Sequence, residues 1–257
     1  LIQSIAKYSE DGVEVQLHHT HGYRGIVTLS GNVAPFITDS DPLFEGRPVA
    51  AVVPWADFAD KKAPLKTSKI LGSYLEWVHH TLHNHPVNVA REKEGRRMLN
   101  GLVTQRAGRL KKVTPFAKMW GLRGLSIASG IIYHGLAGYL GMDVCNVADT
   151  PHPGHDLAKR LELALAALSD HDFIHVHTKM PDQAAHTKAP SYKTRILELL
   201  DQGIGTVLSA LTAQPELLIV VAADHSTPSA GPLIHSGEAV PLVFCGPGIR
   251  RDQVRHY

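Results

Sequence analysis

The sequence lacks the features that mark several protein classes. It has 2 cysteines, and both Cys145 and Cys245 lie in stretches with apolar neighbours, which predicts two buried free thiols in a reducing compartment. No apolar run approaches the roughly 18 residues that a membrane span needs. The formal net charge is only +2, which gives no basis for a nucleic-acid partner. We therefore expect a cytoplasmic protein that binds neither membranes nor nucleic acid, and the sequence leaves its oligomeric state open.

The two ends also lack what a complete chain would show. The sequence begins with Leu1 instead of Met, directly in a segment of helical character. It stops at Tyr257 soon after a strand-like run, without a closing element. We expect a chain that is cut at both ends, so that any targeting segment would lie upstream.

The first part of the chain, residues 1–110, has the pattern of an α+β domain. Residues 12–19 and 23–30 alternate between apolar and polar side chains on either side of a short turn, which predicts a hairpin. Residues 67–84 carry apolar side chains at helical spacing, and a further helix is expected at 91–104.

The second part, residues 111–257, alternates apolar strands with amphipathic helices, which is typical of an α/β layer around a parallel sheet. The run at 217–223 is apolar throughout and predicts a fully buried strand. Strands are expected at 121–129, 172–178, 217–223 and 240–246, and helices at 133–140, 155–168 and 191–211.

Histidine is abundant, with 17 in the chain, and some histidines follow the predicted strands together with aspartates. Open α/β sheets place their sites at the carboxyl ends of strands. Asp182 and His186 are four residues apart after one strand, Asp224 and His225 follow the next, and His235 precedes the last. Each motif alone also fits a helix cap, a polar turn or a surface histidine. Together they predict a metal site, and this donor set suits Mn²⁺, Zn²⁺ or Co²⁺ better than Ca²⁺.

These motifs also carry a family resemblance. The D-x-x-x-H run, the ADHSTP segment and the later His-Ser resemble the metal signature of the alkaline-phosphatase superfamily. The archaeal-type cofactor-independent phosphoglycerate mutases are the most similar members, because stretches of the first half match them as well. The matching stretches are TDSDP at 38–42, HPVN at 85–88, QRAG at 105–108 and GLA at 135–137.

The resemblance implies a ligand set for two metals. Asp182, His186 and His235 match the ligands of one metal, and Asp224 and His225 match ligands of the other. The second metal also takes an Asp and a Ser from the family's N-terminal region, and that Ser is the nucleophile. Neither residue has a counterpart in this sequence, so the catalytic serine is expected upstream of it.

The resemblance also implies how an anionic substrate is held. Guanidinium groups give bidentate contacts to carboxylates and phosphates. Arg106 and Arg109 are the first candidates, and Arg24 and Arg91 are the second. His134 stands where the family usually has a lysine, so it is expected to contact the phosphate and to alter the rate or the choice of substrate.

The implied fold is a partial alkaline-phosphatase-like core at 111–257 with an inserted substrate-binding domain at 1–110. The implied enzyme is an isomerase that interconverts 2- and 3-phosphoglycerate through a phosphoserine, using two divalent metals, with Mn²⁺ first and Mg²⁺, Zn²⁺ or Co²⁺ as alternatives. An inserted domain that excludes water favours this activity. The alternatives are a phosphatase or phosphonate hydrolase on the same scaffold, and a catalytically incompetent metal-binding fragment.

Overall fold

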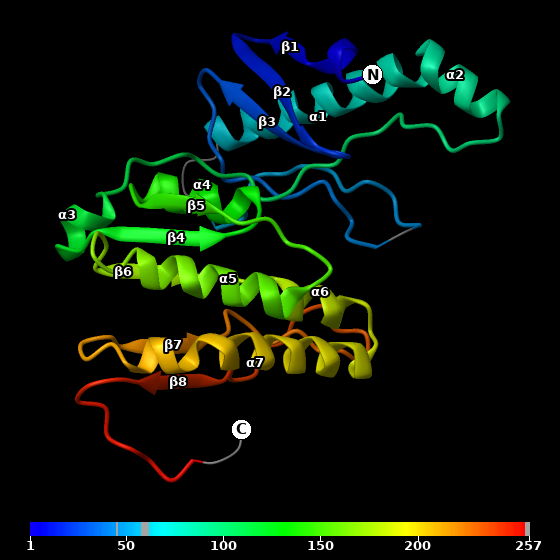
Figure 1. Ribbon diagram of the computed structural model, residues 1–257. Helices are drawn as coiled ribbons and strands as arrows, with labels where there is room; N and C mark the ends of the chain where they lie inside the picture. The colour runs from blue at the N-terminus through cyan, green and yellow to red at the C-terminus, as the bar shows by residue number, and fades with distance from the viewer. Residues whose placement is uncertain (45, 58–61, 255–257) are drawn as a thin grey trace. The chain divides into compact units, whose positions relative to one another are not determined.

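The computed structural model describes residues 1–44, 46–57 and 62–254 (Figure 1). The chain divides into two compact units, Leu1–Lys111 and Lys112–Tyr257. None of the helices in the described ranges has the long apolar stretch that a membrane-spanning helix requires.

The first unit begins with a short 3₁₀ helix, η1 (Ile2–Ile5), and a three-stranded antiparallel sheet in the order β1-β2-β3. The predicted hairpin is confirmed. The helical character expected for the first residues is wrong beyond η1, because β1 follows it as a strand paired with β2. Val13, Val15 and Leu17 are buried because alternate residues of β2 point to the same face. The strands are β1 (Lys7–Glu10), β2 (Val13–His21) and β3 (Arg24–Ser30).

Helix α1 (Lys62–His83) provides the other side of this core. Its buried residues Ile70, Tyr74 and Val78 recur at helical spacing, and the Tyr74 hydroxyl donates a hydrogen bond to the Ile5 carbonyl at 3.0 Å.

The helix expected at 91–104 is wrong. Helix α2 runs from Pro86 to Lys93, with the His85 side chain accepting a hydrogen bond from the amide of Val87 at its start. Gly95 then adopts a φ of +67°, a left-handed conformation that ends helices, and an irregular segment follows.

The second unit is built on a parallel sheet in the order β5-β4-β6, which confirms the α/β expectation. The central strand is buried at every position, as a strand covered on both faces should be. The strands are β4 (Gly124–Ala128), β5 (Asp143–Asn146) and β6 (Phe173–Val176). The helices are α3 (Phe116–Trp120), α4 (Ile131–Tyr139), α5 (Pro153–Ala166), α6 (Met180–His186) and α7 (Pro190–Thr212).

Two further strands depart from the prediction. Strands β7 (Ile219–Ala222) and β8 (Leu242–Cys245) pair with each other antiparallel, in a two-stranded sheet of their own. They are not buried, since Val221 is 51% and Phe244 48% exposed. Apolar composition identified both strands, but it did not predict their burial. Ile219 packs against Val207 and Leu211 of α7, while the other residues of β7 and all those of β8 stay exposed.

The cysteines depart from the expectation in the same way. Cys145 on β5 is half-buried, and Cys245 at the end of β8 is exposed. Apolar neighbours in the sequence therefore did not predict burial for these two thiols.

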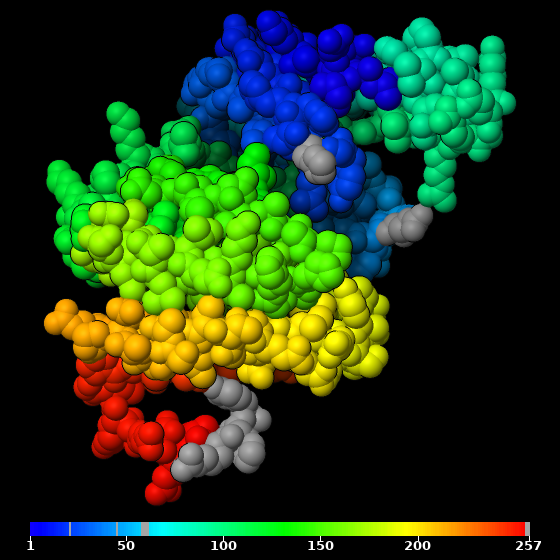
Figure 2. All heavy atoms as spheres, in the orientation of Figure 1, coloured from blue at the N-terminus to red at the C-terminus, as the bar shows by residue number. Residues whose placement is uncertain are grey.

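Helices α5 and α7 touch through their backbones. A Cβ atom added at Gly203 would lie 2.1 Å from the carbonyl oxygen of Gly154, so only glycine fits at this crossing. In the space-filling view α7 forms a continuous yellow-to-orange band of surface over the second unit (Figure 2). The tight contact fixes α7, whose first turns reach the candidate site.

Candidate functional site

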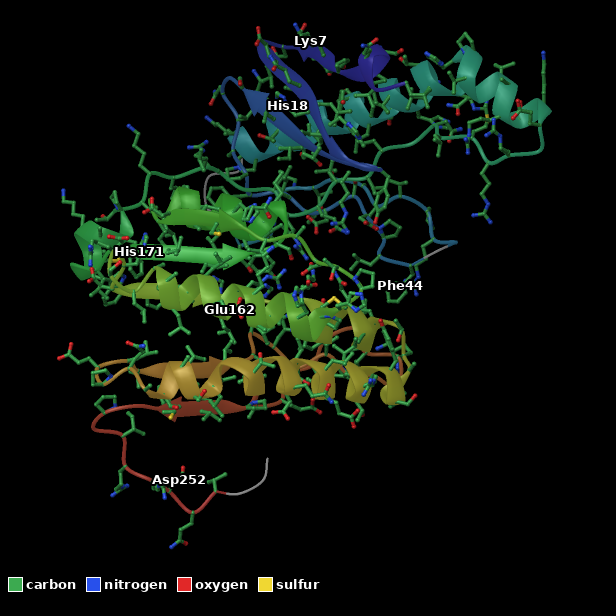
Figure 3. The ribbon with its side chains drawn as sticks, viewed as in Figure 1. Lys7, His18, Phe44, Glu162, His171 and Asp252 are labelled. Carbon is green, nitrogen blue, oxygen red and sulfur yellow. The ribbon has the colours of Figure 1, made fainter. Side chains whose placement is uncertain are left out.

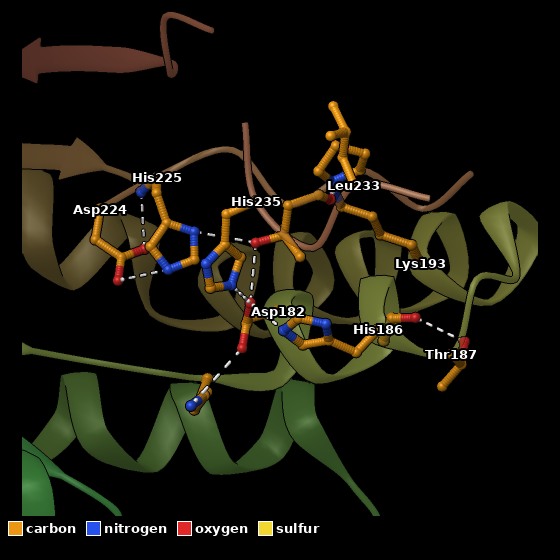
Figure 4. A network of polar contacts seen from close by, with 12 residues as sticks. Asp182, His186, Thr187, Lys193, Asp224, His225, Leu233 and His235 are labelled. Atoms are coloured by element: carbon orange, nitrogen blue, oxygen red, sulfur yellow. Dashed lines mark hydrogen bonds and ion pairs between the residues drawn. The ribbon is translucent and has the colours of Figure 1, made fainter. Parts of the chain in front are cut away.

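The site begins where β6 ends and α6 starts. Because α6 is helical from Met180 to His186, Asp182 and His186 lie one turn apart on the same face, as the four-residue spacing predicted. The Nε2 atom of His186 lies 3.1 Å from Oδ1 of Asp182, and Nε2 of His235 lies 3.5 Å from the same oxygen (Figure 4). The structure therefore brings these three predicted residues together.

The second predicted pair follows β7 and lies against the first group. His225 Nε2 is 3.4 Å from Asp224 Oδ2, and the His225 and His235 rings are 4.1 Å apart between centroids. An isolated antiparallel β-bridge between Ser226 and Ser236 brings these rings together. It pairs the residue after His225 with the residue after His235.

A carboxylate that the sequence analysis missed secures this bridge. Glu238 accepts hydrogen bonds from the hydroxyls of Ser226 and Ser236, at 3.0 and 2.6 Å. These two bonds lower the pKa of Glu238. Its signal in the sequence was a carboxylate three residues after His235, just beyond the His-Ser motif.

The three gathered groups have the spacing of a metal site. One ligand atom from each of Asp182, His186 and His235 can be chosen so that all lie within 4.8 Å of one another. Metal–ligand bonds of about 2.1 Å at tetrahedral or octahedral angles place ligand atoms roughly 3.0 to 3.5 Å apart. The two contacts to Asp182, 3.1 and 3.5 Å, fall in that range, so the residues fit a divalent cation.

The electrostatics around Asp182 favour the ionised carboxylate. Partial burial by itself would raise its pKa, but a hydrogen bond from Thr227 and the nearby His186 and Lys179 lower it below the ordinary value. Asp182 is therefore available as an anionic ligand at neutral pH.

Three residues that sequence reasoning missed hold the loop that carries these ligands. Thr227 donates to Asp182 Oδ1 at 2.9 Å and lies 3.1 Å from Nδ1 of His225. Lys193 donates to the Thr227 carbonyl at 2.8 Å, and Lys188 donates to the carbonyls of Pro228 and Leu233. Thr227 belongs to the ADHSTP segment, so its position beside two ligands was the available signal.

His177 lies at the end of β6 and stacks on Tyr133 of α4, with ring centroids 3.7 Å apart. Burial, and secondarily the neighbouring His175, lower the pKa of His177 to about 4. Its Nδ1 is buried without a hydrogen-bond partner among the described residues. His177 is therefore neutral at physiological pH.

Other histidines are held by ordinary polar contacts. His18 lies in the β2–β3 hairpin with Nε2 at 3.1 Å from the Thr28 hydroxyl. His171 lies at the amino ends of the parallel strands, 3.0 Å from an Asp143 oxygen (Figure 3). The abundance of histidine is thus only partly explained by the metal-ligand cluster.

The residues expected to bind substrate are not gathered within either unit. His134 of α4 places Nε2 3.0 Å from the Ala128 carbonyl, so one of its nitrogens is engaged by the backbone. Arg91 donates to the Arg97 carbonyl and Arg109 to the Val33 carbonyl, each at 2.8 Å. Arg24 lies on β3 over the Tyr23 ring.

Arg106 has the most distinctive setting of these residues. It adopts a φ of +60°, which is unusual for a residue with a side chain, and its amide donates to Asp39 Oδ1 at 2.7 Å. It lines a surface pocket of about 370 Å³ together with Asp39 and Trp55.

Known proteins resemble this chain over nearly its whole length. Residues 4–256 match the family model described as the metalloenzyme superfamily. A 2,3-bisphosphoglycerate-independent phosphoglycerate mutase of Methanocaldococcus jannaschii is 35% identical over 96% of this chain and 56% of its own length. One of Methanopyrus kandleri is 33% identical over 100% of this chain and 60% of its own length.

A solved structure of a phosphoglycerate mutase is also similar to this chain. The cofactor-independent phosphoglycerate mutase from Thermoplasma acidophilum superposes with a TM-score of 0.59 at 25% identity, covering 98% of this chain and 61% of that protein. The chain thus spans between 56% and 61% of the length of these relatives. With the family model matched from residue 4 to residue 256, the chain belongs to the metalloenzyme superfamily.

Proposed function

We propose that this chain provides the metal-binding part of a cofactor-independent phosphoglycerate mutase, an isomerase that interconverts 2- and 3-phosphoglycerate in the cytoplasm. The observation that carries the proposal is the cluster of Asp182, His186 and His235 with the pair Asp224–His225 beside it. The phosphoglycerate mutase names of the relatives support the substrate class.

In this proposal the centre takes two divalent cations, with Mn²⁺ as the first candidate. Asp182, His186 and His235 hold one, and Asp224 and His225 contribute to the other. When bound, such cations neutralise charge on the phosphoryl oxygens and lower the pKa of an attacking hydroxyl. A serine from outside these 257 residues is the proposed acceptor that forms the phosphoserine.

The first unit has the proposed role of binding the substrate and excluding water. Arg106 and Arg109 are proposed to bind the anionic groups of the substrate, with Arg24 and Arg91 as further candidates and His134 near the phosphoryl group. Excluding water matters because a phosphoryl group that meets water is lost as inorganic phosphate.

The test is a ³¹P NMR assay on the protein isolated from its natural source. With 2-phosphoglycerate and Mn²⁺, we expect the 3-phosphoglycerate resonance to grow until the two isomers reach equilibrium, and the Asp182→Asn variant to be inactive. A growing inorganic phosphate signal in place of 3-phosphoglycerate would identify a phosphatase instead. No change in either signal, with metal bound, would refute both enzymatic functions.

A further inference from the structure

A single buried hydroxyl connects the two halves of the metal centre. The Thr227 side chain lies between a carboxylate of the first group, Asp182, at 2.9 Å and an imidazole of the second, His225, at 3.1 Å. Thr227 is only 5% exposed, so water does not compete freely for its hydroxyl. Asp182 comes from α6, whereas His225 and Thr227 follow β7, so the contact exists only in the folded chain.

The number of protons on this hydroxyl determines the direction of both hydrogen bonds. A hydroxyl has one proton to donate, and an ionised carboxylate only accepts. The proton of Thr227 therefore points to Asp182. The contact with His225 must then be donated by the ring, from Nδ1–H to the threonine oxygen.

This assignment leaves the other ring nitrogen of His225 with its lone pair. That atom, Nε2, lies 3.4 Å from Oδ2 of Asp224, a separation at which both atoms can bind the same metal ion. A neutral imidazole binds a metal through its unprotonated nitrogen, and the hydrogen bond at the other nitrogen selects which one that is. The threonine thus fixes the tautomer that a metal at the Asp224–His225 pair needs.

The backbone of Thr227 is itself anchored. The ammonium group of Lys193, on the first turn of α7, donates to the Thr227 carbonyl at 2.8 Å. Lys188, just before that helix, donates to the Pro228 carbonyl at 2.9 Å. Helix α7 is in turn fixed against α5 by the glycine contact, so the hydroxyl is held in place relative to the sheet.

We propose that Thr227 is a positioning residue that couples the two metal positions, by orienting the Asp182 carboxylate and by fixing the tautomer of His225. The proposal depends on the proposed function only in requiring that this centre binds a divalent cation. It assigns no contact between Thr227 and substrate.

The first test measures the tautomer in the metal-free chain. Long-range ¹H–¹⁵N NMR distinguishes a protonated Nδ1 from a protonated Nε2, and a His225→Gln variant assigns the signals. We expect the Nδ1–H form of His225 in the wild type and a shift toward Nε2–H in Thr227→Val, which keeps the shape but lacks the hydroxyl. A wild-type His225 protonated at Nε2 would overturn the proposal.

The second test measures metal binding by calorimetry with Mn²⁺ and by the visible absorption spectrum with Co²⁺. Outer hydrogen-bond partners of metal ligands are worth about 10- to 100-fold in affinity. We expect a loss of that size and a changed Co²⁺ spectrum in Thr227→Val, and near-complete recovery in Thr227→Ser. Wild-type affinity and spectrum in Thr227→Val would overturn the proposal.

Thr67 supplies the matched control. It is 4% exposed, and its hydroxyl also makes two hydrogen bonds, one donated to the Ala63 carbonyl and one accepted from the Ala34 amide. Thr67→Val should lower stability but leave metal affinity unchanged. If the wild type bound no metal, the proposed function would fail, while the tautomer measurement would still decide the role of Thr227.

Discussion

Substituting alanine for Gly203 tests whether the contact between α5 and α7 is as close as the structure shows. The added Cβ would lie 2.1 Å from the Gly154 carbonyl oxygen and 2.8 Å from its carbonyl carbon. Ordinary van der Waals contact begins at 3.4 Å, so the helices would have to separate by about 1.3 Å. Both neighbours are backbone atoms of helices, which cannot move aside as a flexible side chain can.

The magnitude follows from two opposing terms. Overpacking costs about 1 to 3 kcal/mol, and a backbone clash belongs at the upper end of that range. Replacing glycine by alanine inside a helix returns about 0.5 to 1 kcal/mol. We therefore expect Gly203→Ala to lower the free energy of unfolding by about 2 kcal/mol.

The same helix offers the control. Gly205 is two residues away in α7, and a Cβ there would meet nothing within 4 Å. Gly205→Ala should therefore raise the free energy of unfolding by about 0.5 to 1 kcal/mol, from helix propensity alone. Urea unfolding followed by far-ultraviolet circular dichroism gives both values. Midpoints that shifted in the same direction for both variants would refute the close contact.

Three further predictions concern charge and metal. Burial lowers the pKa of His177 to about 4 in the native chain. Between about pH 6.5 and pH 4 the unfolded chain therefore binds a proton that the native chain does not. The free energy of unfolding should fall by up to about 3 kcal/mol across that range as the pH drops. His177→Gln should flatten that part of the urea-midpoint profile, and an unchanged slope would contradict the assignment. Arg160→Met removes one partner of an ion pair whose guanidinium is fully buried, and should cost about 3 kcal/mol. Arg123→Ala at an exposed pair should cost much less, and equal losses would show that burial does not matter here. Asp182→Asn should weaken Mn²⁺ binding by roughly 100-fold or more in calorimetry, because it removes the negative charge of the carboxylate that lies beside both His186 and His235. Asp172→Asn, at the exposed pair with Arg123, should leave the Mn²⁺ affinity unchanged.

Local pattern was enough to predict much of the fold and part of the site. The i, i+4 spacing of Asp182 and His186 places both on one helical face whatever the rest of the chain does. The strand before each ligand group was visible from composition, since β6 and β7 both lie within the expected ranges. The hairpin of the first unit was likewise encoded in alternation around a turn.

Only the tertiary structure decided how distant segments meet. The Ser226–Ser236 bridge and Glu238 bring His235 to Asp182, and the Thr227 hydroxyl reaches Asp182 from another strand end. The sequence misjudged β7 and β8 as buried parallel strands for the same reason. Periodicity and propensity act over neighbouring residues, whereas strand pairing, burial and side-chain hydrogen bonds depend on which segments become neighbours when the chain folds.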